Sequence, residues 1–309
     1  MTTPPAPPGD PAGTRALCGF LVVDKPAGIT SHGCVAAVRR AYGLRRVGHG
    51  GTLDPAVTGV LPIAIGQATR LLPYLSGSKA YTGVVQLGLR TSSDDLQGTV
   101  LERQPLPDLG LAALEQVLQR FRGPILQVPP QVSAVHVGGE RAYARVRRGE
   151  ALDLQARPVT IEQLRLIGWD ASGGLLELEV RCSAGTYIRS LARDLGESLG
   201  CGGTLAQLRR TEALGFDLAA AVPLERLARP PAPPLANPLA ALGHLGQHRL
   251  TPAQLLDWRC GRRLQGDPLP ALEPSAPVAG VAPDGRLAGI AQRSPEGELR
   301  PRLVFDAAG

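Results

Sequence analysis

Short segments in which apolar residues run together or alternate with polar ones predict that strands form much of this protein. Residues 19–23 are an apolar run typical of a buried strand, and residues 24–28 follow it with the Pro and Gly of a turn. Residues 60–65 are a second apolar run of strand length. Residues 80–89 and 175–182 alternate as half-buried strands do. These segments predict a sheet with at least one covered face.

Helical spacing of apolar residues appears between the strands. Thr30 or Ser31 is suited to cap a helix that runs to about residue 41, and Gly43 is suited to end it. Residues 111–121 and 188–199 have the same spacing. Because the helices and strands are interspersed without a regular βαβ period, we expect an α+β domain. Its central sheet should be mixed and largely antiparallel, with helices flanking it.

Two Pro-rich passages suggest how the chain is divided. Residues 1–16 have low complexity and are expected to be disordered, whereas residues 228–240 read as a linker or surface excursion. A short helix is expected from residue 250. Strand-like segments follow at 278–282, 287–291 and 303–305, separated by Asp-Gly and Glu-Gly hairpin signals. We therefore expect a main domain over residues 17–246 and a small β-rich domain over residues 247–309.

The basic charge favours a polyanionic partner. The net charge is +6, the isoelectric point is about 9.4, and all but two of the 33 basic residues are arginine, the exceptions being Lys25 and Lys79. Arginine suits phosphate contacts and stacking on bases. A coding bias explains the excess equally well, and any single Arg pair is typical of a solvated helix face. Paired arginines recur at 39–40, 45–46, 147–148, 209–210 and 262–263. Their number favours RNA.

Several classes of protein are disfavoured by what the sequence lacks. The five cysteines are scattered without a Cys-x-x-Cys pair, which argues against a zinc ribbon or a redox motif. No apolar run approaches the roughly 18 residues of a membrane span, and the N-terminus lacks the order of a secretory signal. There is no Walker or Gly-x-Gly-x-x-Gly motif. We expect a cytoplasmic protein with no membrane association, metal or cofactor.

The segment with the most chemical content is 47–70, VGHGGTLDPAVTGVLPIAIGQATR. Its glycines permit close approach of another molecule, and they surround His49, Asp54 and Pro55. A carboxylate on such a loop is typical of a functional site. An Asx-turn that merely stabilises the loop is equally compatible with the residues, and a phosphate-binding loop is a third interpretation.

Residues 48–70 resemble the signature of the TruB family of pseudouridine synthases, which has Gly-x-Leu-Asp-Pro-x-x-Thr-Gly around the catalytic aspartate. The resemblance extends over about residues 19–245, in order and spacing. The other matching blocks are 21–28 (LVVDKPAG), 79–81 (KAY), 129–143 (PPQVSAVHVGGERAY), 183–189 (SAGTYIR) and 195–210 (LGESLGCGGTLAQLRR).

The resemblance implies the pseudouridine synthase fold and an isomerase. Its substrate would be the T-loop uridine of tRNA, conventionally position 55, flipped out of its stack. Asp54 would act on the glycosidic bond, Arg189 would keep that carboxylate charged, and Tyr81 would stack on the base or receive the C5 proton. The reaction is redox-neutral and isomeric, which agrees with the absence of a cofactor motif.

The resemblance also implies a set of residues around the base. Tyr187 would pack on the other side of it, Leu208 would line the pocket, and His49 would fill the space that the base vacates. Lys25 would support the loop or contact phosphate. Without the resemblance, each of these is more simply a core or loop residue, and Arg189 a surface arginine.

Contacts to the T arm of tRNA are expected from an insert at about residues 122–150. The residues predicted to bind RNA there are Arg141, Arg145, Arg147 and Arg148. Residues 247–309 occupy the place of a PUA domain, a small RNA-binding β-barrel. The sequence departs from the family at His136, where relatives have Lys, and at residues 91–93. Both departures are expected outside the catalytic centre.

Two other functions are compatible with the same resemblance. One is a non-catalytic RNA-binding or tRNA-folding protein, which the presence of Asp54, Tyr81 and Arg189 disfavours. The other is the guide-RNA-dependent branch of the family. Its members have protein partners and usually long basic tails, and this sequence lacks such tails. We therefore expect a monomer that needs no protein partner.

Overall fold

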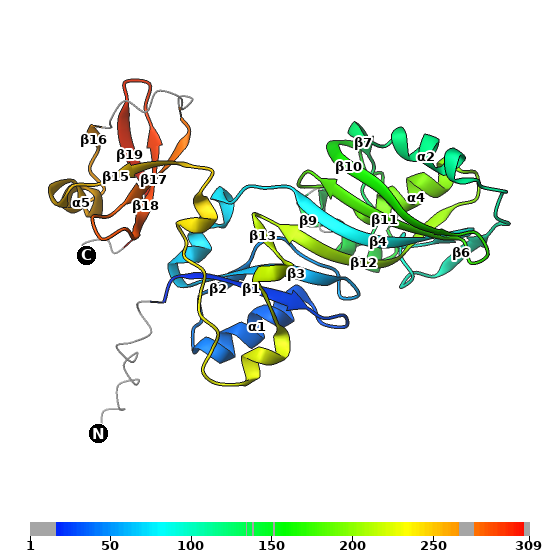
Figure 1. Cartoon of the computed structure of the whole chain (residues 1–309), viewed down its shortest axis with the longest axis horizontal. Coiled ribbons are helices and arrows are strands. Elements are labelled where there is room, and N and C mark those ends of the chain that lie inside the picture. Colours follow the sequence, from blue (N-terminus) through cyan, green and yellow to red (C-terminus); the bar gives the residue numbers. More distant parts are fainter. Residues whose placement is uncertain (1–16, 134, 138, 151, 266–274, 306–309) are drawn as a thin grey trace.

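The computed structural model describes residues 17–133, 135–137, 139–150, 152–265 and 275–305 (Figure 1). The Pro-rich segment 1–16, for which disorder is predicted, lies outside these residues. None of the described helices is long and apolar enough to cross a membrane.

A single mixed sheet runs through the larger part of the molecule (Figure 1). Its strands are β1 (Gly19–Lys25), β2 (Val47–His49), β3 (Thr58–Ile65), β4 (Lys79–Leu87), β7 (Gly123–Gln127), β10 (Arg157–Asp170), β11 (Leu175–Cys182), β12 (Gly203–Ala213), β13 (Phe216–Asp217) and β14 (Ala221–Pro223). The main path is β14-β1-β3-β12-β4-β11-β10-β7, with β2 paired to β3 and β13 to β12. Only the pairs β1–β14 and β3–β12 are parallel. The predicted mixed, largely antiparallel sheet is confirmed.

Glycine explains one difference between the predicted and observed strands. The alternating segment 80–89 was expected to be one strand, but β4 ends at Leu87. Gly88 follows with a φ of 79°, a left-handed conformation that interrupts a strand. The chain then enters β5 (Leu89–Thr91), which pairs with β6 (Val100–Arg103) in a separate two-stranded sheet.

The helices lie close to their predicted positions and have identifiable ends. Helix α1 (Ser31–Tyr42) begins where the Thr30 side chain accepts a hydrogen bond from Gly33 N (3.0 Å), and it ends at Gly43 in the left-handed conformation. Helix α2 (Leu111–Gln119) and helix α4 (Ile188–Ser198) flank the other half of the sheet (Figure 1). Helix α4 buries nearly its whole length, including Arg189 and Leu191.

Short elements complete the larger part. They are the 3-10 helices η1 (Gly66–Tyr74), η2 (Leu218–Ala220), η3 (Leu224–Ala228) and η4 (Ala240–Leu242), the strands β8 (His136–Val137) and β9 (Glu140–Arg141), and helix α3 (Ala142–Arg147). The last three lie within the predicted RNA-contacting insert.

The C-terminal residues form a second, smaller sheet (Figure 1). Its strands are β15 (Gly246–Arg249), β16 (Leu264–Gln265), β17 (Pro277–Val281), β18 (Leu287–Arg293) and β19 (Glu298–Val304), in the order β15-β17-β18-β19-β16. Helix α5 (Pro252–Arg259) covers it with the buried Trp258, whose indole N–H donates to Ala288 O (2.9 Å). This curled sheet fits the predicted PUA-like fold.

The two sheets are joined by a shared apolar cluster. Ala68 and Leu71 of η1 pack with Ile290 and Leu303 of the small sheet. Arg70 also donates from Nη1 to Val304 O (2.9 Å). The C-terminal part therefore packs on the larger sheet through η1.

We expect Gly196→Ala to destabilise the fold because Gly196 lets α4 pack directly on the start of β12. A Cβ there would lie 2.1 Å from the backbone of Gly202 and Gly203, and backbone cannot move aside locally. Overpacking of this kind costs about 1–3 kcal/mol or more.

Urea denaturation measures this effect. The matched control is Gly243→Ala, where the added Cβ meets only Ala240 O at 3.5 Å and the backbone is helical. Equal midpoints for the two variants would contradict the tight contact between α4 and β12.

Candidate active site

The loop that carries Asp54 joins β2 to β3 and is held from three sides. Ser31 Oγ donates to Leu53 O (3.0 Å) and accepts from Leu53 N (2.9 Å). Gly28 N donates to Pro55 O (2.9 Å), and Arg210 Nη2 donates to Gly51 O (3.0 Å). The turn after β1, helix α1 and strand β12 thus fix the loop through its backbone.

Lys25 also holds this loop. It has no accessible surface, and its Nζ donates to Pro26 O (2.9 Å) and Pro55 O (3.0 Å). Burial lowers the pKa of the Lys25 ammonium, and the nearby Asp54 partly offsets that effect. A side chain with no exposed surface does not reach an RNA phosphate, so of the two predicted roles the geometry supports the loop contact.

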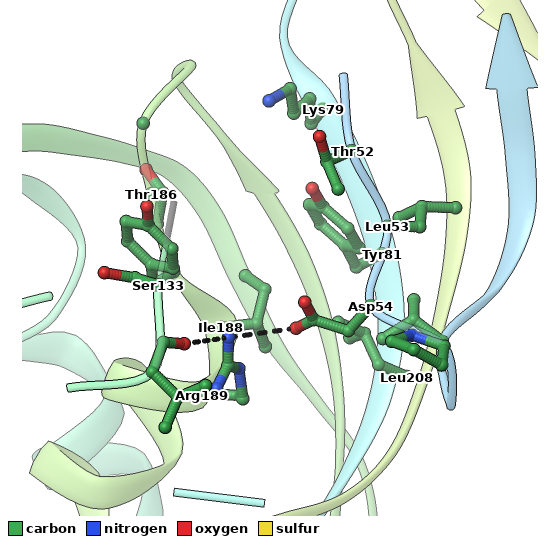
Figure 2. Close-up of a pocket in the computed structure, with 15 residues that line it drawn as sticks. Thr52, Leu53, Asp54, Lys79, Tyr81, Ser133, Thr186, Ile188, Arg189 and Leu208 are labelled. Atoms are coloured by element: carbon green, nitrogen blue, oxygen red, sulfur yellow. Dashed lines mark hydrogen bonds and ion pairs between the residues drawn. The ribbon is translucent and has the colours of Figure 1, made fainter. Parts of the chain in front are cut away.

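Asp54 is paired with Arg189 across a pocket. Arg189 Nη2 lies 3.0 Å from Asp54 Oδ2, and the Arg189 side chain is 9% exposed while that of Asp54 is 46% exposed (Figure 2). No described backbone amide donates to the Asp54 carboxylate, so the Asx-turn interpretation is wrong. The aspartate is a half-exposed carboxylate aimed at a buried guanidinium.

Arg189 connects several segments besides the Asp54 loop. Its Nη1 donates to Ser93 O and its Nη2 to Val132 O, both at 3.0 Å, and Nη1 lies 3.6 Å from Asp95 Oδ2. The segment 91–93, expected outside the catalytic centre, therefore contacts it directly. Sequence reasoning also missed Asp95, because nothing in its local pattern indicates an arginine distant in sequence.

A pocket of about 530 Å³ is lined by five of the seven residues predicted to act in catalysis or to surround the base (Figure 2). Asp54, Arg189, Tyr81, Tyr187 and Leu208 all line it. Further lining residues that sequence analysis did not single out are Thr52, Leu53, Val57, Lys79, Val132, Ser133, Thr186 and Ile188. The pocket thus has a charged pair at one side and aromatic and aliphatic walls around it, which suits a flat polar ring.

The aromatic walls are positioned by the sheet and by α4. Tyr81 lies on β4 opposite Arg210 of β12 and is 6% exposed. Burial raises the pKa of the Tyr81 phenol, and the Arg210 guanidinium partly offsets the rise. Tyr187 precedes α4, where its N donates to Gln127 Oε1 (2.8 Å) and its O accepts from Gln127 Nε2 (3.1 Å).

His49 does not line the pocket described above. It lies at the end of β2, and its ring packs edge-on against His32 with centroids 5.3 Å apart. Burial lowers the pKa of His49, and the charges of His32 and Arg210 lower it further. Its imidazole is therefore biased towards the neutral form at the loop entrance.

Two of the arginines predicted to contact RNA form ion pairs with glutamates of the same insert. Arg145 Nε lies 2.7 Å from Glu150, and Arg148 lies 2.6 Å from Glu140 and 2.9 Å from Glu150. Arg141 lies in β9 and Arg147 in α3. These ion pairs reduce the local positive charge that the sequence suggests.

Metal-ligand geometry is missing from the part of the chain that the structure describes. No group of three or more His, Cys, Asp or Glu there is arranged to hold an ion. The arrangement that remains is one carboxylate, one buried guanidinium and a ring-sized pocket.

Comparisons with known proteins match this architecture. The family model described as TruB family pseudouridylate synthase (N terminal domain) matches residues 39–188, and the tRNA pseudouridylate synthase B C-terminal domain matches residues 189–230. A tRNA pseudouridine synthase B of Parasynechococcus marenigrum is 62% identical over 291 residues, which cover 94% of this chain and 98% of that protein. Another from Synechococcus sp. (strain WH7803) is 58% identical over 301 residues, covering 95% and 99%.

Solved structures share the fold. An H/ACA RNP bound to a substrate RNA containing 2'-deoxyuridine aligns with a TM-score of 0.70 at 23% identity, covering 93% of this chain and 84% of the other. An archaeal box H/ACA sRNP Nop10-Cbf5 complex aligns with a TM-score of 0.68, covering 96% and 88%. This likeness shows the fold alone.

We expect Lys25→Met to loosen the loop around Asp54, because it removes the ammonium that joins the carbonyls of Pro26 and Pro55. Pro26 O loses this donor, and Pro55 O keeps only Gly28 N. Unsatisfied buried polar groups cost about 1–3 kcal/mol. Amide hydrogen exchange of residues 52–57 should accelerate, and the free energy of unfolding should fall.

Arg40→Met, a charge loss on the exposed face of α1, is the control and should leave that exchange unchanged. Protection of residues 52–57 that stays at its original level in Lys25→Met would show that Lys25 does not hold the loop.

Proposed function

Because the chain belongs to the TruB family of pseudouridylate synthases, and is thus an isomerase that converts a tRNA uridine to pseudouridine, we propose that Asp54 performs this reaction on the T-loop uridine at position 55. The observation that carries the proposal is the 3.0 Å contact between Asp54 and the buried Arg189 at the wall of the pocket. That pair places one carboxylate next to a ring-sized space.

One carboxylate suffices for the chemistry. The N1–C1′ bond breaks, the base turns, and C5 joins C1′ in its place, so all atoms are retained. Asp54 attacks C1′ or balances the positive charge that develops there. Arg189 holds the carboxylate in place through the 3.0 Å ion pair. A second carboxylate that activates water is unwanted, because hydrolysis would release the base.

The walls of the pocket hold the detached base. The Tyr81 ring stacks on it, or the Tyr81 oxygen takes the C5 proton when it is deprotonated. Tyr187 packs on the other side of the base, and Leu208 lines the pocket. Unstacking of the target base costs a few kcal/mol, and stacking contacts in the pocket offset that cost. His49, at the loop entrance, fills the space that the base leaves.

The remainder of the surface holds the T arm of tRNA. The catalytic domain of residues 17–246 includes the RNA-contacting insert of about residues 122–150, and the PUA-like domain of residues 247–309 follows it. Phosphate contacts supply affinity, while loop shape and the extruded base supply selection. We propose that the protein works as a cytoplasmic monomer with no cofactor and no obligatory protein partner, in contrast to the H/ACA assemblies that share its fold.

Tritium release tests the role of Asp54. With tRNA that carries tritium at uridine C5, the native protein should release tritium, and Asp54→Asn should be slower by on the order of 10³-fold or more, since the amide neither attacks nor balances charge. A chelator should have no effect on the native rate.

Asp108→Asn is the matched control at an exposed aspartate, and it should keep the native rate. Equal release by native protein and Asp54→Asn would overturn the proposal. Binding of tRNA without release by the native protein would favour the non-catalytic, RNA-folding alternative.

The structure also predicts that Arg45 contributes more to tRNA binding than Arg148 does. Arg45 is exposed, four residues before His49, and has no ion-pair partner among the described residues, whereas Arg148 is paired with Glu140 and Glu150. Arg45→Ala should weaken binding and reduce the slope of log K against log salt by about one, as expected for one lost phosphate contact. Arg148→Ala should change the slope less. Filter binding over a salt series measures both, and a larger change for Arg148→Ala would reverse the assignment.

A further inference from the structure

Lys79 is a lysine in the pocket that the reaction described above does not use. It lies at the start of β4, two residues before Tyr81, so both side chains are on the same face of the strand. It is half-buried and lines the pocket. Figure 2 shows Lys79 beside Thr52, on the side of the Tyr81 hydroxyl, with Asp54 on the opposite side of that ring.

Arg210 lies close to Lys79 and adds a second positive charge. Its side chain has no accessible surface, and its Nε and Nη2 donate to Val60 O (2.8 Å) and Gly51 O (3.0 Å). Its Nη1 is buried without a hydrogen-bond partner at normal geometry among the described atoms. Burial lowers the pKa of Arg210, and the Tyr81 hydroxyl, which interacts with the guanidinium, partly offsets that effect. A Cβ on Gly51 would stand 3.4 Å from Arg210 Nη1 and 3.9 Å from Lys79 Nζ, so the two cations converge on the same loop residue.

No described carboxylate balances this pair of cations. Neither side chain has an ion-pair partner among the described residues. The titratable groups that affect the pKa of Lys79 are Arg210 and the Cys182 thiol. Burial raises the pKa of Cys182 to about 11, so that thiol is neutral at pH 7. Burial and Arg210 both lower the pKa of Lys79. A negatively charged group bound in the pocket would be stabilised by Lys79 and Arg210, and it would in turn favour the charged form of Lys79.

We propose that Lys79 is a further catalytic residue, whose ammonium stabilises the negative charge of the uracil base after it separates from the ribose. The inference rests on the proposed function, since it places uracil against Tyr81. Arg210 is a positioning residue: it holds the Gly51 carbonyl and lies against Tyr81, so that Lys79 and the ring keep their places.

The charge arises from the bond that breaks. When N1–C1′ cleaves, its electron pair leaves with N1 and spreads over O2 and O4 of the base, while C1′ becomes positive and is met by Asp54. When C5 then bonds to C1′, the pair returns to form that bond, the C5 proton departs to a base, and N1 gains a proton. The base is thus anionic only between the two steps, when a fixed cation beside it contributes most.

A phosphate contact is the competing use of Lys79, and kinetics separate the two. Single-turnover pseudouridine formation at saturating enzyme reports the chemical steps, and filter binding over a salt series reports phosphate contacts. Lys79→Met should lower the single-turnover rate on the order of 10- to 100-fold, as loss of a charge-stabilising donor does, with little change in tRNA affinity or salt slope. Lys79→Arg should restore part of the rate.

Substrate electronics give a second, independent measurement. Fluorine at C5 withdraws electrons and stabilises the uracil anion by itself. In tRNA with 5-fluorouridine at the target position, consumption of that nucleotide should be slowed less by Lys79→Met than consumption of uridine is. Arg165→Met, which removes an exposed charge paired with Glu179 on the same sheet, is the control and should behave as native protein.

Three results would overturn the proposal: a native single-turnover rate in Lys79→Met, an equal slowing for uridine and 5-fluorouridine, or a loss confined to affinity with the salt slope reduced by about one. The last result would make Lys79 a phosphate ligand. Failure of the proposed function itself is separable, because it would show as native protein that is no faster than Asp54→Asn.

Discussion

The contact between Arg189 and Asp54 is the interaction on which the rest of the site depends. Arg189 brings a fixed positive charge to within 3.0 Å of the Asp54 carboxylate while it is itself nearly removed from solvent. The cost of burying that guanidinium is offset by the carbonyls of Ser93 and Val132 and by the nearby Asp95. One side chain therefore links the loop between β2 and β3, the turn after β5 and the insert, so disruption of any of them reaches the carboxylate.

The pairing of β4 with β12 decides which side chains face the pocket. Their antiparallel register sets Tyr81 opposite Arg210, and Leu208 opposite Gly83 on the same pair of strands. A one-residue slip would turn Tyr81 away from the pocket, since side chains alternate between the two faces of a strand. The glycine loop then passes over Arg210, which binds its backbone. The sheet thus supplies rigid walls, and only the carboxylate is carried by a loop.

Charge is distributed unevenly between the pocket and the surface. Within the insert, acids of the same segment neutralise Arg145 and Arg148, so a count of arginines overstates the charge available to RNA. At the pocket, Lys79 and the neighbouring Arg210 keep their positive charge without a described carboxylate partner. Positive charge without a partner is costly in a protein interior and is retained where a ligand supplies the anion. These cations thus favour a negative charge on a molecule bound in the pocket.

The sequence by itself determined the mixed α+β fold, most helix limits and the strand-rich C-terminal part, because these follow from periodicity, caps and turns. The resemblance of its motifs also predicted that Asp54, Arg189 and Tyr81 belong together. Only the tertiary structure decided that Asp95 shares Arg189 and that Lys79 faces the pocket, since both depend on approach of segments distant in the chain. Burial likewise assigned Lys25 to the loop, because local sequence does not reveal how much solvent a side chain meets.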